Sequence, residues 1–469
     1  MKKFILTIAA ALFVSSTMFA QFRATDQTGI NVFELPKVET PWNGPKVEFG
    51  GSISMPYIAL TQSNYATNST NPDVSNPVKN PQALFKNSPN FGLSMANLYI
   101  NSYLADGISL QVTLYLASKH HNETWVKGGY VQFDKVPFIK LDLLDQIMKY
   151  TTIKVGQMDV NYGDAHFRRS DGGLGIYNAF MENYIMDEFA TEIGAEADVN
   201  YKGIIGTVAV TDGELNPDLN YIDTTQAKYK YSNGYHNPSL IVKLGYDKQI
   251  TDKFRARITG SVYTNAGSVS NTLFGGDRTG SNYSAVMYNL APGTTTAFNG
   301  RFNPGLTDKI TTFMGNLFLK YKVLDALAVE SFTTYEAASG RTMIEQKDRT
   351  ANQFATDLIF RFGKAENFFI GARYNTVNSN IAAIGSKTAA ALNTANAVTT
   401  YTLGQDAVPA GPISINRLAI SGGWYVTKNL LAKVEYVNQT YNYNLAPTVN
   451  YIFNGAEFHG LSAEAVISF

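Results

Sequence analysis

Short segments in which apolar and polar residues alternate recur along most of the chain. In residues 109–117, Leu110, Val112 and Leu114 alternate with Gln111 and Thr113. Successive side chains of a β-strand point to opposite faces, so this pattern predicts strands with one apolar and one polar face. Sixteen such segments occur, at residues 47–58, 91–104, 109–117, 125–133, 151–158, 193–199, 204–210, 240–246, 254–263, 313–323, 327–335, 354–362, 368–375, 417–425, 430–437 and 457–469.

The connections between these segments are alternately short and long. Turns at 105–107, 201–203, 324–326, 364–366 and 427–429 alternate with long connections, among them 59–90, 266–311, 337–353 and 377–413. Short turns at one end and long loops at the other are typical of outer-membrane barrels, which have an even number of strands. The chain is therefore predicted to be all-β, a 16-stranded antiparallel transmembrane β-barrel. Fourteen or eighteen strands remain open, because the first and fourth segments are weak.

Two other features fit this interpretation. Beyond the N-terminal region, no stretch approaches the eighteen apolar residues that a membrane-spanning helix needs. Residues 141–150 depart from the alternation, since Leu141, Leu144 and Ile147 recur at helical spacing, which predicts a short surface helix at a periplasmic turn. A barrel of this size encloses an aqueous channel.

The two ends of the chain indicate export to the bacterial cell outer membrane. Residues 1–20 combine Lys2 and Lys3 with a short apolar run, which predicts a signal peptide whose exact cleavage site is open. Residues 21–45 contain three prolines and are predicted to be a periplasmic N-terminal leader, followed by the barrel at 46–469. The alternating terminal segment ends in Phe469 and resembles the strand that the barrel-assembly machinery recognises. The secreted chain has no cysteine and needs no disulfide framework.

The connection at about residues 160–190 is the most unusual stretch. It mixes both charge signs with many aromatic residues, and a loop of this length is normally functional or disordered. The aromatic content argues against disorder. We expect this third long loop to fold inward and form a pore constriction, with the charged residues Asp164, Arg168, Arg169, Asp171, Glu182, Asp187 and Glu188.

Polar faces of the strands supply a charge map of the lumen. Basic residues are expected on the lumen wall at Lys243, Arg255, Arg257, Lys320, Arg361, Arg373 and Arg417, and acidic residues at Glu192, Glu196 and Asp198. Opposed rows of charge would produce a transverse field across the pore. Alternatively, these charges pair between neighbouring strands and stiffen the wall. Both interpretations remain open from the sequence.

Adjacent Arg168 and Arg169 also allow two roles. Guanidinium groups match the geometry of phosphate and carboxylate, so the pair could guide anionic solutes through the constriction. In that case, replacing both by Gln would shift ion permeability toward cations. Alternatively, they tie the loop to carboxylates such as Asp164 or Asp171.

A resemblance to a known family rests on the segment around this loop. Residues 153–157 (Ile-Lys-Val-Gly-Gln), 162–163 (Tyr-Gly), 180–182 (Phe-Met-Glu) and 192–194 (Glu-Ile-Gly) resemble the third-loop region of phosphate-selective-type sixteen-stranded porins. The resemblance covers about 45 residues. It implies a trimeric diffusion channel. The arginines and lysine ladder on which that family's phosphate sites depend are not matched. Composition is similar to that of Bacteroidetes outer-membrane proteins.

These observations predict a porin for passive diffusion of small hydrophilic or ionic solutes. Its expected partners are outer-membrane lipid, those solutes, the barrel-assembly machinery and two further copies in a homotrimer, with no nucleic acid. No catalytic motif or cofactor site is found, and the histidines are not spaced as zinc ligands. They are His120, His121, His166, His236 and His459. The alternatives are a substrate-specific, phosphate-like anion channel and a structural barrel or adhesin with a blocked lumen.

Overall fold

The computed structural model describes most of the chain from residue 23 onward. The described residues are 23–35, 37, 42–65, 83–84, 87–116, 124–171, 173–188, 190–215, 220–223, 228–231, 236–268, 270–275, 282–283, 286–287, 300–342, 348–380, 389–392, 398–401, 412–445 and 451–469. The expected signal peptide, His120 and His121 lie outside them.

Strands make up nearly all of the regular structure. Among the described residues, the helices are the short 3-10 turns η1 (Gln27–Gly29) and η2 (Ala165–Arg168) and the helix α3 (Asp142–Met148). The strands are β1 (Lys46–Ser63), β2 (Asn90–Phe91), β3 (Met95–Ala105), β4 (Ile108–Tyr115), β5 (Trp125–Phe133), β6 (Thr151–Asp159), β7 (Thr191–Tyr201), β8 (Ile204–Thr211), β9 (Asn220–Asp223), β10 (Lys228–Tyr231), β11 (Ser239–Thr251), β12 (Phe254–Asn265), β13 (Lys309–Leu324), β14 (Leu327–Arg341), β15 (Arg349–Phe362), β16 (Phe368–Asn380), β17 (Ala389–Leu392), β18 (Val398–Tyr401), β19 (Pro412–Thr427), β20 (Leu430–Asn442) and β21 (Glu457–Ser468).

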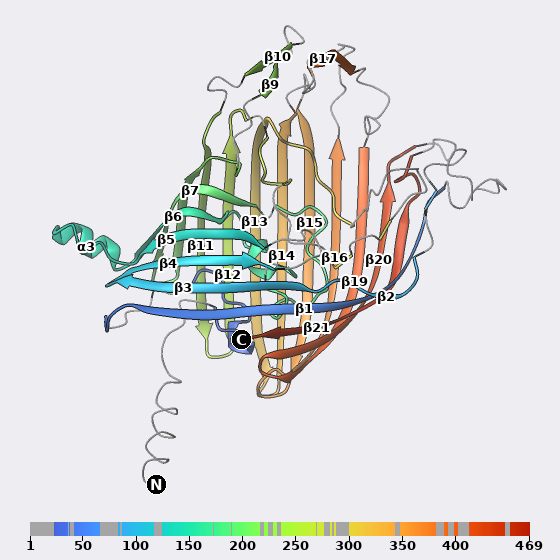
Figure 1. The fold of residues 1–469 in the computed structure, drawn as a ribbon. Helices are drawn as coiled ribbons and strands as arrows, with labels where there is room; N and C mark the ends of the chain where they lie inside the picture. The colour runs from blue at the N-terminus through green and yellow to red at the C-terminus, as the bar shows by residue number, and fades with distance from the viewer. Residues whose placement is uncertain are drawn as a thin grey trace.

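Sixteen of these strands form a closed antiparallel barrel (Figure 1). Each pairs with the next along the sheet, and β1 closes the ring by pairing with β21 from Ser52↔Ser468 to Ser63↔Glu457. The two-residue strand β2 pairs with β1 beyond the stretch that pairs with β3, while β9–β10 and β17–β18 form separate hairpins. The predicted sixteen-stranded barrel is therefore confirmed.

The wall strands extend further than the alternation alone indicated. β14 runs to Arg341 and β15 begins at Arg349, so the expected connection at 337–353 shrinks to residues 342–348. Backbone pairing between strands does not require apolar side chains on the outer face. These strands therefore continue beyond the segments in which apolar and polar residues alternate. The predicted short helix is also present, as α3 between β5 and β6. Below, the end of the barrel where turns of two to five residues join most strand pairs, and where α3 joins β5 to β6, is called the short-turn end. The opposite end is called the long-loop end.

The outer face of the barrel is apolar. Leu244, Ile258, Phe313, Ile370 and Leu461 are among many large apolar side chains that point outward and are exposed. A closed barrel satisfies every backbone polar group between strands, so it can place this surface in lipid. The chain is an outer-membrane β-barrel protein. Among the described residues, no helix has both the length and the apolar character required to cross a bilayer.

The inner face is less polar than expected. Phe318, Phe332, Ile359 and Phe369 point inward from β13 to β16 and are buried, although the alternation predicted a polar lumen. They belong to one apolar cluster with residues of the loop at 160–190. The lumen is partly a packed core, because the loop and the wall cover each other's apolar side chains.

Phe469 closes the seam between the first and last strands. Its backbone exchanges hydrogen bonds with that of Gly51, at 2.9 and 3.0 Å. Deleting Phe469 is expected to remove this closure and, if the assembly machinery reads the residue, to lower the amount of heat-modifiable barrel in membranes. The matched control is the substitution Phe469→Tyr, which keeps the backbone and an aromatic ring at this position. An unchanged yield of the deletion variant would contradict the prediction.

Candidate functional site

The loop between β6 and β7 lies inside the barrel. Most described residues between Val160 and Ala190 are buried, and their contacts run to the inner face of β11–β21. Side chains of the wall hold the loop backbone: Asn316 accepts the N–H of Asp164 at 2.9 Å, and Asn375 accepts that of Ile185 at 2.7 Å. Buried backbone groups must be hydrogen-bonded, so these wall amides allow an irregular segment to lie within the lumen.

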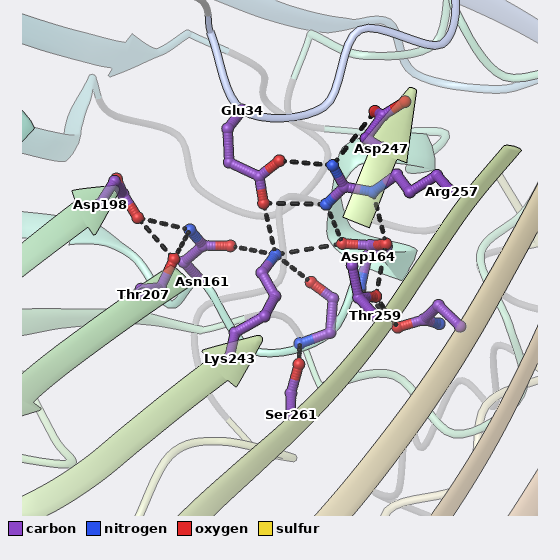
Figure 2. A network of polar contacts seen from close by, with 12 residues as sticks. Glu34, Asn161, Asp164, Asp198, Thr207, Lys243, Asp247, Arg257, Thr259 and Ser261 are labelled. Atoms are coloured by element: carbon purple, nitrogen blue, oxygen red, sulfur yellow. Dashed lines mark hydrogen bonds and ion pairs between the residues drawn. The ribbon is translucent and has the colours of Figure 1, made fainter. Parts of the chain in front are cut away.

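Asp164 is the centre of the polar network that fixes the start of the loop (Figure 2). Its carboxylate accepts two hydrogen bonds from Arg257, at 2.7 and 2.8 Å, and one from the Thr259 hydroxyl at 2.7 Å. The Lys243 ammonium lies 3.1 Å away. Burial opposes ionisation of Asp164, but Lys243 and Arg257 outweigh it and keep the pKa of this carboxyl below its usual range. Asp164 is therefore a charged anchor of the loop.

The N-terminal leader enters the barrel at the same place. Glu34 lies 2.9 Å from Lys243 and accepts two hydrogen bonds from Arg257, at 2.7 and 2.9 Å (Figure 2). Asn31 donates to Glu330 at 2.6 Å, near the short-turn end of β14. The leader was expected to lie on the periplasmic side. Instead, Asn31 and Glu34 contact the inner face of the barrel, and Arg23 contacts the loop, whereas Leu35 and Trp42 are exposed.

Arg168 and Arg169 are buried and occupied by partners within the chain. Arg168 donates to Asn31 at 2.7 Å and lies 3.5 Å from Glu330. Arg169 makes a bidentate contact with Asp171, at 2.8 and 3.0 Å, and also donates to Asp187. These contacts correspond to the second role considered from the sequence, in which the arginines tie the loop in place.

The remaining predicted constriction residues also lie buried among protein groups. Glu182 accepts the N–H groups of Asn183 and Tyr283, each at 3.0 Å. Asp187 contacts Arg301 at 3.2 Å, so a residue of the connection between β12 and β13 is bound to the loop. Glu188 is buried, and its Oε1 has no hydrogen-bond partner among the described residues.

The wall cations contact neighbouring strands, the loop or the leader. Their partners are Glu34 and Asp164 for Lys243 and Arg257, Asp247 for Arg255, Glu366 for Lys320, Glu330 for Arg361, Asp357 for Arg373, and Gln439 with two loop carbonyls for Arg417. On the acidic side, Lys154 lies 2.7 Å from both Glu196 and Asp198, and Glu192 accepts from Thr211 and Tyr263. The transverse-field hypothesis needs opposed rows of unpaired charge, and these contacts do not support it.

A cavity of about 1040 Å³ occupies the part of the lumen that the loop leaves uncovered. It follows the inner face of β1 and β3–β8 and reaches from Lys46 and Phe469, at the short-turn end, to Lys127 and Asp159 toward the long-loop end. The opposite side is bounded by the leader and by the loop, at residues such as Phe33, Phe167 and Arg169. The loop therefore divides the lumen into a packed half and a hollow half.

Of the predicted site residues, only some reach this cavity. Arg169, Asp171, Glu196 and Asp198 line it, whereas the other residues predicted for the site do not. The sequence analysis missed Glu34 and Asn31 of the leader, and Gln111, Tyr130 and Lys154 on the hollow wall. The alternation places the polar residues of β4 and β5 toward the lumen, but no charge marks Gln111 and Tyr130 as site residues. No periodicity indicates that the leader contacts the inner wall.

Within the described residues, no group of three or more His, Asp or Glu side chains is arranged to hold a metal ion. No known protein family and no curated protein matches the sequence. Solved structures of similar shape include the outer membrane channel DcaP of Acinetobacter baumannii, with 12% identity and a TM-score of 0.47, covering 91% of this chain and 98% of that one. An anion-selective porin from Comamonas acidovorans has 8% identity and a TM-score of 0.46, covering 91% and 100%. OmpT, an outer membrane protein of Vibrio cholerae, has 10% identity and a TM-score of 0.45, covering 91% and 98%. At such identities, the strand pairing of the chain itself remains the evidence for its barrel.

Proposed function

We propose that the protein is a porin, a passive diffusion channel for small hydrophilic solutes across the outer membrane. The observation that carries the proposal is the cavity along β1 and β3–β8, which extends over much of the wall and has charged and polar side chains around it. The loop at 160–190 fills the opposite half, so its cavity-facing edge forms the constriction. Solutes pass between this edge and the uncovered wall.

Conductance of the purified protein in planar bilayers tests this proposal. Thr113 lines the cavity, whereas Thr333 faces outward on β14. Thr113→Trp is expected to lower the single-channel conductance, because the larger side chain narrows the path. Thr333→Trp, the same change on the lipid-facing side, is the control and should leave conductance unchanged. Equal conductance in all three proteins would place the ion path elsewhere.

A structural barrel with a blocked lumen is the second candidate. It is favoured by the apolar cluster that seals the loop against β13–β16. A folded, heat-modifiable protein without conductance in bilayers would support the blocked barrel and exclude the channel.

We further propose that the channel discriminates only weakly between anions and cations. Seven Lys and Arg side chains and eight Asp and Glu side chains line the cavity, so their formal charges nearly cancel. A phosphate-like specificity would need an excess of basic groups. We therefore expect a reversal potential close to zero under a salt gradient of potassium chloride. A strongly anion-selective reversal potential would restore the phosphate-like alternative.

Replacing Arg168 and Arg169 by Gln separates their two roles. Because both guanidinium groups are buried against partners, we expect a lower unfolding temperature and a reversal potential that stays nearly unchanged. Removing one member of a buried pair costs about 3–5 kcal/mol. Arg341→Gln, at a partly exposed ion pair with Asp308, is the control. A shift toward cations without loss of stability would instead assign both arginines to solute selection.

The proposed homotrimer remains a prediction. Light scattering of the protein purified in detergent measures the mass of the oligomer directly, and a monomer mass would contradict it.

A further inference from the structure

Three neighbouring strands that border the hollow half of the lumen, β3, β4 and β5, carry almost no charge. β3 and β4 contain no Asp, Glu, Lys or Arg at all, and β5 contains only Lys127. Their side chains toward the cavity include Tyr99, Gln111, Thr113, Tyr130 and Gln132. The charged wall of β11–β20 is instead covered by the loop. A solute in the cavity therefore meets amides and hydroxyl groups over this part of the wall.

Hydrogen bonds hold the polar groups on this wall in fixed orientations, and at one end of the network Gln132 Nε2 donates to the Asp134 carboxylate at 3.1 and 3.3 Å. The Tyr130 hydroxyl donates to Gln111 Oε1 at 2.7 Å, and Gln111 Nε2 donates to Gln132 Oε1 at 3.2 Å. Each amide carries two N–H donors and a carbonyl oxygen with two lone pairs, so one bond of each kind leaves further capacity. A donor and an acceptor are thus presented side by side, which is the combination that a hydroxyl group of a solute can satisfy.

Aromatic rings lie on the other side of the same cavity. Phe33 of the leader and Phe167 and Tyr177 of the loop line it. Phe33 and Phe167 contact each other edge to face, with ring centroids 5.8 Å apart. Ligand sites commonly combine aromatic side chains with a few oriented polar groups. The aromatic side covers the C–H faces of a solute, while the amide wall binds its hydroxyl groups.

Several of the charged groups at the margins of this region have partners of the opposite sign, while Arg23 and Lys37 donate to backbone carbonyls. Lys154 lies between Glu196 and Asp198, Lys46 contacts Glu48, and Arg169 contacts Asp171. An ionic solute would have to compete with these intramolecular pairs, whereas an uncharged one would not. The structure therefore favours neutral ligands over phosphate or carboxylate ions.

We propose that this cavity is a binding site for neutral polyhydroxylated solutes, with the chemistry of a short oligosaccharide, along the wall of β3–β5. The assignment deepens the proposed channel function and, for its physiological meaning, rests on it. The volume of about 1040 Å³ is at the upper end of the range for ligand pockets, so it accommodates a molecule of two or three sugar rings.

Equilibrium dialysis of the detergent-purified barrel against labelled raffinose, a neutral trisaccharide, tests the site without relying on conduction. Saturable binding is expected, with no competition from inorganic phosphate. Gln111→Ala and Tyr130→Phe should each weaken binding roughly two- to ten-fold, the effect of losing a hydrogen bond. Gln249→Ala, at the exposed end of β11, is the matched control and should bind as the unmodified protein does. Heat modifiability of every variant verifies that the barrel has folded.

Raffinose should also reduce the ion current through the channel in bilayers, over the same concentration range. Conductance with neither current block nor saturable binding would overturn the site and leave the channel function intact. Saturable binding without any conductance would overturn the channel function and keep the site. Displacement of raffinose by phosphate, or equal binding by the Gln111→Ala protein, would overturn the assignment to neutral solutes.

Discussion

Asp164→Ala is expected to produce a barrel that conducts more than the unmodified protein and unfolds at a lower temperature. The carboxylate joins the loop to Lys243, Arg257 and Thr259 on the wall (Figure 2). Without it, two buried cations lose a shared partner, which costs about 3–5 kcal/mol. The start of the loop is then released from β11 and β12, and the lumen widens.

Single-channel conductance and thermal unfolding measure these two effects in the same preparation. Asp325→Ala is the control, because Asp325 contacts Lys322 at an exposed turn and should alter neither property. Asp164→Asn keeps the shape of the side chain and removes its charge. Its conductance and unfolding temperature should therefore lie between those of the unmodified protein and of Asp164→Ala. Unchanged conductance together with lower stability would show that the loop stays in place without this anchor.

Deleting residues 21–37 should increase the conductance of the channel. Glu34 of the leader accepts from Arg257 and pairs with Lys243. Asn31 donates to Glu330 and accepts from Arg168. Arg23 adds a hydrogen bond to the Phe167 carbonyl at 2.7 Å. These contacts hold the leader against the loop and the inner wall. Deleting the leader is therefore expected to open space in the lumen and to leave buried cations with fewer partners.

Conductance of the shortened protein is compared with that of an Asn31→Ala, Glu34→Ala protein, which keeps the full length. The double variant should show a smaller increase, because the chain still occupies the lumen. A shortened protein with unchanged conductance would show that the leader does not obstruct the path. If the shortened protein fails to insert into membranes, the leader is needed for assembly, and the prediction that it obstructs the channel is contradicted.

The strand count and the direction of most side chains followed from the sequence. In β4, Leu110 and Val112 face outward while Gln111 faces the lumen, as the alternation indicated. The reason is local: in a strand, neighbouring residues point to opposite faces, and lipid on one side imposes an apolar choice at every second position. The short turns and α3 were visible for the same reason, since their signals lie within a few residues.

The filling of the lumen was decided by tertiary structure. The sequence indicated that the loop at 160–190 is unusual, but Arg168 meets Asn31 and Asp164 meets Arg257 across 137 and 93 residues. No periodicity encodes such pairings, because they depend on how the loop and leader pack after the ring has closed. Phe318 and Phe332 point into a lumen that the alternation predicts to be polar, and they pack in one apolar cluster with residues of the loop. The sequence by itself therefore determined a barrel with a lipid face and a polar face. Only the folded chain decided which polar residues became buried struts and which line the cavity, since burial and charge pairing in the lumen arise from contacts between segments far apart in the chain.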